Sequence, residues 1–398
     1  MTAATAPPST TLGPAGGWLS DADCSLDDFR ALVERTTDPD DYPCAERVEN
    51  NIVVYGDRLH DRVASAPGRR EMQSELVRAL ADGPGIVVFK RAVEPAVVDR
   101  ATGVFNAMIV EQKAAGVRGG DHFARPGAND RVWGALDKFA VRAPQQFAEY
   151  YGCEALALVS EAWLGPAYQV TSQVNVVNPG GTAQTAHRDY HLGFMAAAQA
   201  RAYPAHAHLL TPALTLQGAV AHCDMPLETG PTMYLPYSQT YPAGYLAFHR
   251  PDFTDYFVEH YVQLPLEKGD AAFFNPAVFH GAGTNRSSDV RRMANLLQVS
   301  SAFGRAMETV DRTAMSKALY PALARAMAAG ADETHVRNVV AASAEGYAFP
   351  TNLDADQPVD GLAPRSQAEL VWSALQRDLQ PREVERQLDV QQARRGGR

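Results

Sequence analysis

Two short segments carry residue types that could bind a metal ion. The first is His187-Arg188-Asp189, and the second ends the apolar run 271–279 with His280. Side chains two residues apart on an extended segment point to the same face, so His187 and Asp189 can reach one ion, with His280 as the third ligand from a neighbouring strand. Two imidazoles and one carboxylate leave open coordination positions, which is the ligand set of non-haem Fe(II) oxygenases.

A His-x-Asp triplet alone is weak support, because such triplets also occur on surface turns and as satisfied buried groups. The chain after His280 adds to it. Residues 281–286 are typical of a turn, and residues 290–300 are typical of a further strand. An arginine at the start of that strand would lie beside the metal pocket, where its planar guanidinium can hold a dicarboxylate by a bidentate pair.

Taken together, these segments resemble the phytanoyl-CoA dioxygenase family of Fe(II)/2-oxoglutarate-dependent oxygenases. Four pieces match in order, over roughly residues 80 to 302: the early strand 85–90, the ligand segment 187–191, the segment 228–238, and the stretch from Gly269-Asp270 through His280 to Arg291. The third piece is similar to the family's Asn-Gly-x-Leu-x-x-x-Pro-Gly-Ser segment. It departs from it at Thr229 and Tyr237, where the family commonly has Asn and Gly.

The resemblance implies roles for individual residues. His187, Asp189 and His280 would bind iron and form the catalytic centre, and Arg291 would pair with the distal carboxylate of 2-oxoglutarate. Arg292 is the alternative, one residue on and therefore on the other face of the strand. Because Asp189 is present, the comparison with halogenating relatives argues against halogenation.

The resemblance also implies a fold and a reaction. The expected fold class is mainly β with surrounding helices (α+β), a double-stranded β-helix of the jelly-roll or cupin-like kind with helical N- and C-terminal additions. The expected activity is that of a dioxygenase, which uses Fe(II), 2-oxoglutarate and O2 to hydroxylate an unactivated C–H bond of a small molecule and releases succinate and CO2. Two alternatives stay open: a non-redox metal-dependent hydrolase or isomerase on a cupin-like barrel, and a binding module with a vestigial site.

Polar side chains near the proposed centre are candidates for holding the co-substrate. The run 168–178 alternates as a strand does and places Thr171, Gln173 and Asn175 on one face. If that face lines the barrel interior, the three side chains can hydrogen-bond the polar end of 2-oxoglutarate, since buried amides need partners. The alternative is an outward polar face.

Two further groups are candidates for substrate contact. Tyr190 and Phe194 would line the substrate entrance, and His191 would share the face of the first two ligands if the segment stays extended. The Gly- and Pro-containing loop 119–133 carries Arg125, Arg131 and Trp133, and such loops often form substrate sites. A solvated loop with a tryptophan packed beneath it is the alternative.

Composition limits the classes of partner. Of 398 residues, 46% are hydrophobic and 21% are charged, and the formal net charge is −10. The acidic balance argues against nucleic acid or an anionic membrane as the main partner and leaves a small-molecule substrate. Four widely spaced cysteines indicate neither a zinc knuckle nor a disulfide framework. With no signal-like start and no long apolar run, we expect a cytoplasmic protein.

The same patterns predict the order of domains. We expect a disordered N-terminus at 1–20, a helical extension at 21–80, the oxygenase domain at 81–302, a helical C-terminal region at 303–390, and a flexible tail at 391–398. Ser366-x-x-Glu369 is a capping box that predicts a helix start in the C-terminal region. That region would brace the barrel, form a homodimer contact, or act as a lid.

Overall fold

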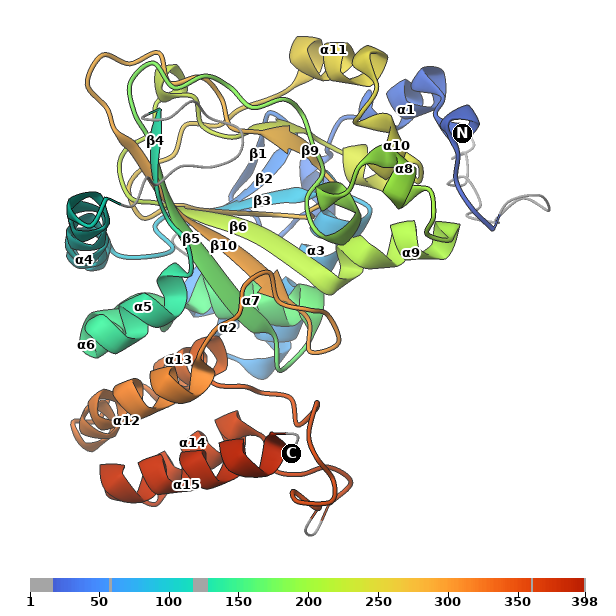
Figure 1. The fold of residues 1–398 in the computed structure, drawn as a ribbon. Coiled ribbons are helices and arrows are strands. Elements are labelled where there is room, and N and C mark those ends of the chain that lie inside the picture. The colour runs from blue at the N-terminus through green and yellow to red at the C-terminus, as the bar shows by residue number, and fades with distance from the viewer. Residues whose placement is uncertain (1–16, 57–58, 117–127, 359–360, 397–398) are drawn as a thin grey trace.

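The strands of the protein lie in two sheets. The structure is a computed structural model that describes residues 17–56, 59–116, 128–358 and 361–396. Its strands are β1 (Arg47–Glu49), β2 (Ile52–Tyr55), β3 (Ile86–Phe89), β4 (Asn129–Val132), β5 (Gln169–Val177), β6 (Thr215–Ala221), β7 (Met233–Leu235), β8 (Ala271–Phe274), β9 (Phe279–Gly281) and β10 (Arg292–Ser300). Eight of them form one sheet in the order β1-β2-β3-β8-β6-β10-β5-β4, and β7 pairs with β9 (Figure 1).

Helices surround the large sheet in Figure 1, with the C-terminal ones gathered at one end of the molecule. The α-helices are α1 (Leu26–Val33), α2 (Leu59–Val63), α3 (Ala66–Ala81), α4 (Pro95–Ala114), α5 (Ala135–Arg142), α6 (Pro144–Tyr151), α7 (Glu154–Leu164), α8 (Ala197–Ala200), α9 (Ala205–Leu210), α10 (Gly244–Ala247), α11 (Pro251–His260), α12 (Arg312–Ala328), α13 (Glu333–Ser343), α14 (Gln367–Gln376) and α15 (Pro381–Arg395). The fold is therefore a mixed α+β fold. A closed jelly-roll barrel stays a prediction.

The large sheet is buried on both faces, and its side chains alternate between two cores. On β3, Val87 and Phe89 pack into the main core with the helices, whereas Ile86 and Val88 pack into a smaller core on the other side. This follows from the period of two along a strand. Strand β10 lies between β5 and β6, and its register places Gln298 opposite both Thr171 and Gln217. The face away from the helices is therefore available to line a site.

Two predicted segments differ in the structure. The region 21–80, expected to be helical, also contains β1 and β2, and β2 runs parallel to β3 as part of the large sheet. The expected loop 119–133 contains β4, which pairs with β5. The strands β1, β2 and β4 are short. For β2 and β4, pairing with a strand distant in the sequence decides the conformation, rather than the local pattern. The expected N-terminal disorder falls mostly on residues 1–16, which lie outside the described residues.

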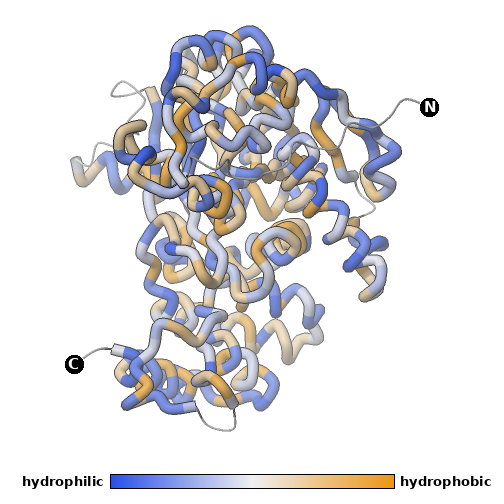
Figure 2. Tube along the Cα trace, turned by 90° about the vertical axis from the view of Figure 1, so that its right-hand side faces the viewer, coloured by the Kyte–Doolittle hydropathy of each residue, from blue (hydrophilic) through white to orange (hydrophobic). Residues whose placement is uncertain are grey.

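The C-terminal region consists of α12 to α15, and Figure 2 shows orange and blue residues alternating along the chain near the C-terminus, the pattern of amphipathic helices. The predicted capping box at Ser366 is present, with Glu369 accepting from the Ser366 backbone at 2.7 Å. The prediction of a flexible tail from Gln391 is wrong over residues 391–395, because α15 continues to Arg395 and the buried Gln391 donates to the Arg365 carbonyl at 2.8 Å.

Among the described residues, no helix combines the length and the apolar character needed to cross a bilayer.

Candidate metal centre

The two histidines of the predicted centre face each other across an isolated β-bridge. His187 N–H donates to the His280 carbonyl at 3.0 Å, and His280 N–H donates to the His187 carbonyl at 3.1 Å. His280 lies in β9, which also pairs with β7. Pairing of backbones that are distant in sequence therefore brings the two imidazoles together, with ring centroids 4.5 Å apart.

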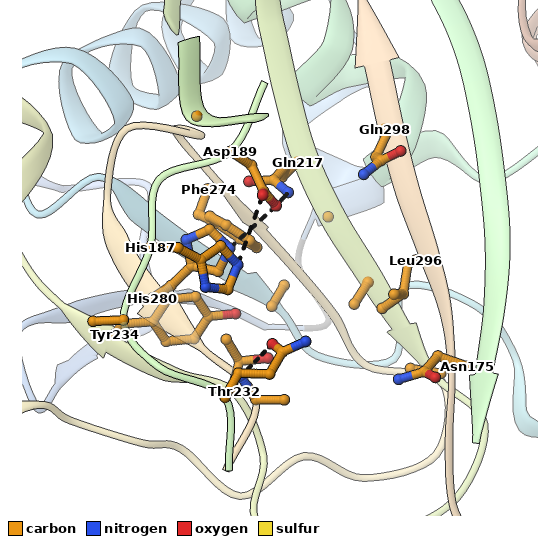
Figure 3. Close-up of a pocket in the computed structure, with 18 of the residues that line it drawn as sticks. Asn175, His187, Asp189, Gln217, Thr232, Tyr234, Phe274, His280, Leu296 and Gln298 are labelled. Carbon is orange, nitrogen blue, oxygen red and sulfur yellow. Dashed lines mark hydrogen bonds and ion pairs between the residues drawn. The ribbon is translucent and has the colours of Figure 1, made fainter. Parts of the chain in front are cut away.

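The side chains of His187, Asp189 and His280 converge on one point (Figure 3). One ligand atom from each residue lies within 4.8 Å of the others. The Nε2 atom of His187 is 3.6 Å from Asp189 Oδ1, and the Nε2 atom of His280 is 3.4 Å from Asp189 Oδ2. This is the arrangement expected of two imidazole ligands and one carboxylate ligand around a small divalent ion.

Backbone carbonyls fix which nitrogen of each imidazole faces the metal position. His187 Nδ1 lies 2.9 Å from the Thr185 carbonyl, and His280 Nδ1 lies 2.9 Å from the Val278 carbonyl. Because a carbonyl only accepts, each Nδ1 carries the proton, and each Nε2 presents its lone pair to the site. Partners of this kind orient ligands and raise their basicity in metal centres.

The electrostatics favour a neutral imidazole beside an ionised carboxylate. Burial lowers the pKa of His187, which keeps the ring neutral and able to bind a metal. Burial alone would raise the pKa of Asp189. The adjacent imidazoles of His187 and His280 and a hydrogen bond from Gln217 nevertheless hold that pKa below its usual range. Asp189 is therefore an anion, and Gln217 Nε2 donates to its Oδ2.

A cavity of about 1020 Å³ opens from this centre. Its floor is the face of the large sheet turned away from the helices, and alternate residues of β10 line it: Arg292, Ala294, Leu296 and Gln298. Figure 3 shows Asn175, Leu296 and Gln298 on the side of the cavity across from the histidines. The volume is at the upper end of that of small-molecule sites.

The two neighbouring arginines have different surroundings, and this corrects the prediction for Arg291. Arg291 is half-exposed, does not line the cavity, and pairs with Asp130 at 2.9 Å. Arg292 is 7% exposed and lines the cavity, and its guanidinium donates to the Thr229 and Gly283 carbonyls at 3.0 and 3.3 Å. Burial lowers the pKa of Arg292 to about 10, so it remains a cation at neutral pH.

Tyr190, His191 and Phe194, which were predicted to contact the substrate, do not lie together, because the backbone changes direction after Asp189. Tyr190 and His191 have φ values of 64° and 38°, and a short 3-10 helix, η3 (His191–Phe194), follows. The segment is therefore not extended beyond Asp189. His191 turns away to contact Thr211 Oγ1 at 2.6 Å, and Tyr190 is buried without lining the cavity. Phe194 lines the cavity as predicted and is 50% exposed.

The other predicted residues fall into three groups. Gln173, Asn175, Arg131 and Trp133 line the cavity. The Arg131 guanidinium lies over the Trp133 ring, 4.3 Å from its centroid, and donates to Gln173 Oε1. Thr171 does not line the cavity, because its hydroxyl donates to the Gln298 carbonyl at 2.9 Å within the sheet. Arg125 lies outside the described residues.

Sequence reasoning missed Gln217 and Gln298, both on the cavity floor. Gln217 is the single amide of the strand 215–221, and in the strand 292–300 Gln298 is the one amide on its face, because Asn295 is at the opposite position of the alternation. In a strand, every second residue faces the ligands. A lone amide at such a position could have identified both residues, since buried amides need partners.

Fold and site together define a mixed α+β protein with a His-Asp-His centre in the wall of a sheet-lined cavity. The chain belongs to the phytanoyl-CoA dioxygenase (PhyH) family, whose sequence model matches residues 81–293, just over half of the chain. No curated protein matches it.

Several solved structures are distantly similar. The non-heme alpha ketoglutarate dependent epimerase SnoN from nogalamycin biosynthesis is 18% identical, with 60% of this chain and 84% of that chain covered and a TM-score of 0.38. The alpha ketoglutarate dependent carbocyclase SnoK from the same biosynthesis is 18% identical, with 59% and 86% covered and a TM-score of 0.40. AviO1 from Streptomyces viridochromogenes Tue57 is 16% identical, with 59% and 97% covered and a TM-score of 0.42. The family assignment does not depend on these likenesses.

Proposed function

We propose that the protein is an Fe(II)- and 2-oxoglutarate-dependent oxygenase that oxidises a C–H bond of a small molecule, with hydroxylation as the default outcome. The observation that carries this proposal is the convergence of His187, Asp189 and His280 within 4.8 Å, with both imidazole Nε2 atoms turned toward the carboxylate. Family membership supports it. When bound, the iron and its co-substrate would supply the oxidising power, while the protein positions the substrate.

Arg292 is the residue we assign to the distal carboxylate of 2-oxoglutarate. It is a buried cation on the cavity wall, and among the described residues no carboxylate pairs with it. A buried charge without a counter-ion is costly, so the position favours an anionic ligand. Its two carbonyl contacts fix the guanidinium while leaving other N–H groups free to hold a carboxylate.

The cavity would accept the organic substrate beside the co-substrate. Apolar walls near the mouth, including Phe194, Met195 and Phe248, would exclude water from the reacting carbon. The Gln217 side chain would keep Asp189 oriented and ionised through its hydrogen bond. Each step that the chain itself performs is therefore binding, orientation or exclusion of water.

The test is an anaerobic titration of metal-free protein with Fe(II) and then 2-oxoglutarate, followed by visible absorption. We expect a charge-transfer band of the chelate in the wild-type protein and none in His187→Ala. The matched control is His206→Ala, because His206 is exposed on α9 and should keep the band.

A different result would redirect the search. If no band forms and the protein instead retains Zn(II) tightly, the oxygenase proposal is wrong and non-redox hydrolysis or isomerisation takes its place. If neither metal binds, the protein would be a binding module with a vestigial site.

A further inference from the structure

Three glutamines lie side by side on the cavity floor, and we call Gln173, Gln298 and Gln217 the amide strip. They belong to the adjacent strands β5, β10 and β6, and all three line the cavity. Gln298 is directly opposite Gln217 in the register, and Gln173 Nε2 donates to Gln298 Oε1 at 3.4 Å. The strip ends beside the metal centre, where Gln217 donates to Asp189.

The strip has unused hydrogen-bonding capacity inside the protein. A carboxylate accepts only, so the Gln217 amide nitrogen must face Asp189 and its Oε1 must point elsewhere. That oxygen is buried and has no hydrogen-bond partner among the described residues, in a side chain that is 6% exposed. Gln298 is 8% exposed, and its Nε2 donates no hydrogen bond to any residue that the structure describes. Buried amide groups left open in a cavity indicate a ligand that completes them.

The charged side chains at the far end of the strip have partners within the chain. Arg131, at the far end, donates to Gln173 and stacks on Trp133. Glu308 is close by and accepts from the Gly134 N–H at 2.7 Å. Burial raises the pKa of Glu308, whereas hydrogen bonds from Gly134 and Gln173 and the nearby charges of Lys138 and Arg131 oppose that rise. Arg131 thus lies near a carboxyl group of the protein itself, and Arg292 is assigned to the co-substrate. Among the described residues, the strip therefore offers an organic substrate amide groups rather than an unpaired charge.

We propose that the amide strip selects the substrate, and that the substrate is a neutral, polyhydroxylated small molecule. One hydroxyl would donate to Gln217 Oε1 next to the metal centre, and further oxygens would accept from the Gln298 amide. An unsubstituted acyl chain would leave these buried groups unpaired, which sites of this kind penalise strongly. The inference rests on the proposed function for the reaction, but the binding it describes needs no metal.

The experiment is ligand-observed NMR on the full-length, metal-free protein with three classes of ring compound of similar size. The neutral polyhydroxy probes are methyl glycosides and cyclitols, the apolar probe is cyclohexylmethanol, and the anionic probe is cyclohexanecarboxylate. We expect binding from the polyhydroxy class. Gln298→Met, which keeps the side-chain length and removes the amide, should weaken that binding about threefold to tenfold, the value of one or two neutral hydrogen bonds. The same substitution should strengthen binding of cyclohexylmethanol.

The matched control is Gln145→Met, the same chemical change on the exposed surface of α6, which should leave all three classes unaltered. Opposite shifts for polar and apolar probes cannot come from a merely misfolded variant, which would lose all binding. The inference is overturned if no polyhydroxy probe binds, if apolar or anionic probes bind better than they do, or if Gln298→Met affects all classes alike. The charge-transfer band of the wild-type protein separately decides the proposed function, so the two failures are distinguishable.

Discussion

Arg291 and Arg292 are consecutive residues whose side chains leave the start of β10 on opposite sides. Arg292 enters the cavity and is 7% exposed, whereas Arg291 faces outward and pairs with Asp130. The alternation of a strand allows only one of two neighbours to face a given side. The length of the turn between His280 and β10 therefore decides which arginine meets a ligand of the metal centre.

Replacing these two arginines in turn tests the assignment. Arg292→Met should weaken 2-oxoglutarate binding by about tenfold to a hundredfold, because hydrogen bonds to charged groups contribute about 1.5–3 kcal/mol. Arg291→Met should change it by less than about twofold, since surface pairs such as that with Asp130 contribute about 0–1 kcal/mol. Anaerobic titration of the charge-transfer band measures both constants. The reverse order would return the role to Arg291.

A second pair of substitutions tests how the ligand segment is anchored. Arg188 lies between two ligands, is fully buried, and donates to the carbonyls of Ser238 and Tyr241. A Cβ at Gly244 would lie 1.9 Å from the Arg188 Cζ atom, so Gly244→Ala must displace the guanidinium. We expect a loss of about 2–4 kcal/mol in the free energy of unfolding, typical of overpacking that also breaks buried hydrogen bonds. Fe(II) affinity should fall with it.

Gly103→Ala is the control for that substitution. Gly103 is exposed in α4, and a Cβ there meets nothing within 4 Å. Removing glycine from a helix interior should stabilise the protein by about 0.5–1 kcal/mol. Urea unfolding measures both variants. If Gly244→Ala is as harmless as Gly103→Ala, the close approach to Arg188 does not limit the site.

The buried His222 predicts a dependence of stability on pH. Its Nδ1 lies 2.7 Å from Thr102 Oγ1 and its Nε2 lies 2.9 Å from the Tyr150 hydroxyl, on the helical side of the sheet. Burial lowers its pKa from 6.5 to about 3 in the folded protein. Between those values the unfolded chain binds a proton that the folded protein does not, so stability falls as the pH drops below 6.5. From pH 7 to pH 5 the loss from this residue is about 2 kcal/mol.

Comparison with His222→Gln isolates this contribution from those of other titrating groups. The variant should be less stable than the wild type at pH 7, because it loses hydrogen bonds and packing. It should also lose less on acidification, so the difference between the two proteins narrows at pH 5. Urea unfolding at both pH values gives the four free energies. An equal loss in both proteins would mean that His222 is protonated in the folded state.

Local pattern predicted those parts of the fold that local physics decides. The early strand expected at 85–90 is β3, and the helix start predicted by the capping box at Ser366 is the start of α14. By contrast, β4 is the polar sequence Asn-Asp-Arg-Val and is a strand only because it pairs with β5. Neither composition nor periodicity carries that information.

Some features of the metal centre were likewise predictable from the sequence, and others were not. The types and spacing of His187, Asp189 and His280 gave weak support alone, and the resemblance to the family's segments was needed to predict that they come together, as they do. The orientation of their neighbours was not predictable. Tyr190 and His191 both adopt a positive φ, which is uncommon for residues with large side chains, and this change of direction removes His191 from the ligand face. Such conformations depend on tertiary packing.

Because β2 pairs with β3, a shortened chain that can be expected to fold by itself must include β2. The family match starts at residue 81, but Ile52 and Val54 belong to one core of the sheet and Val53 and Tyr55 to the other. A fragment cut at residue 81 would leave the backbone of β3 as an unprotected edge with apolar side chains on both faces, the kind of edge that recruits other chains. For expression and engineering, the boundary of this domain lies before β1 rather than at the start of the family match.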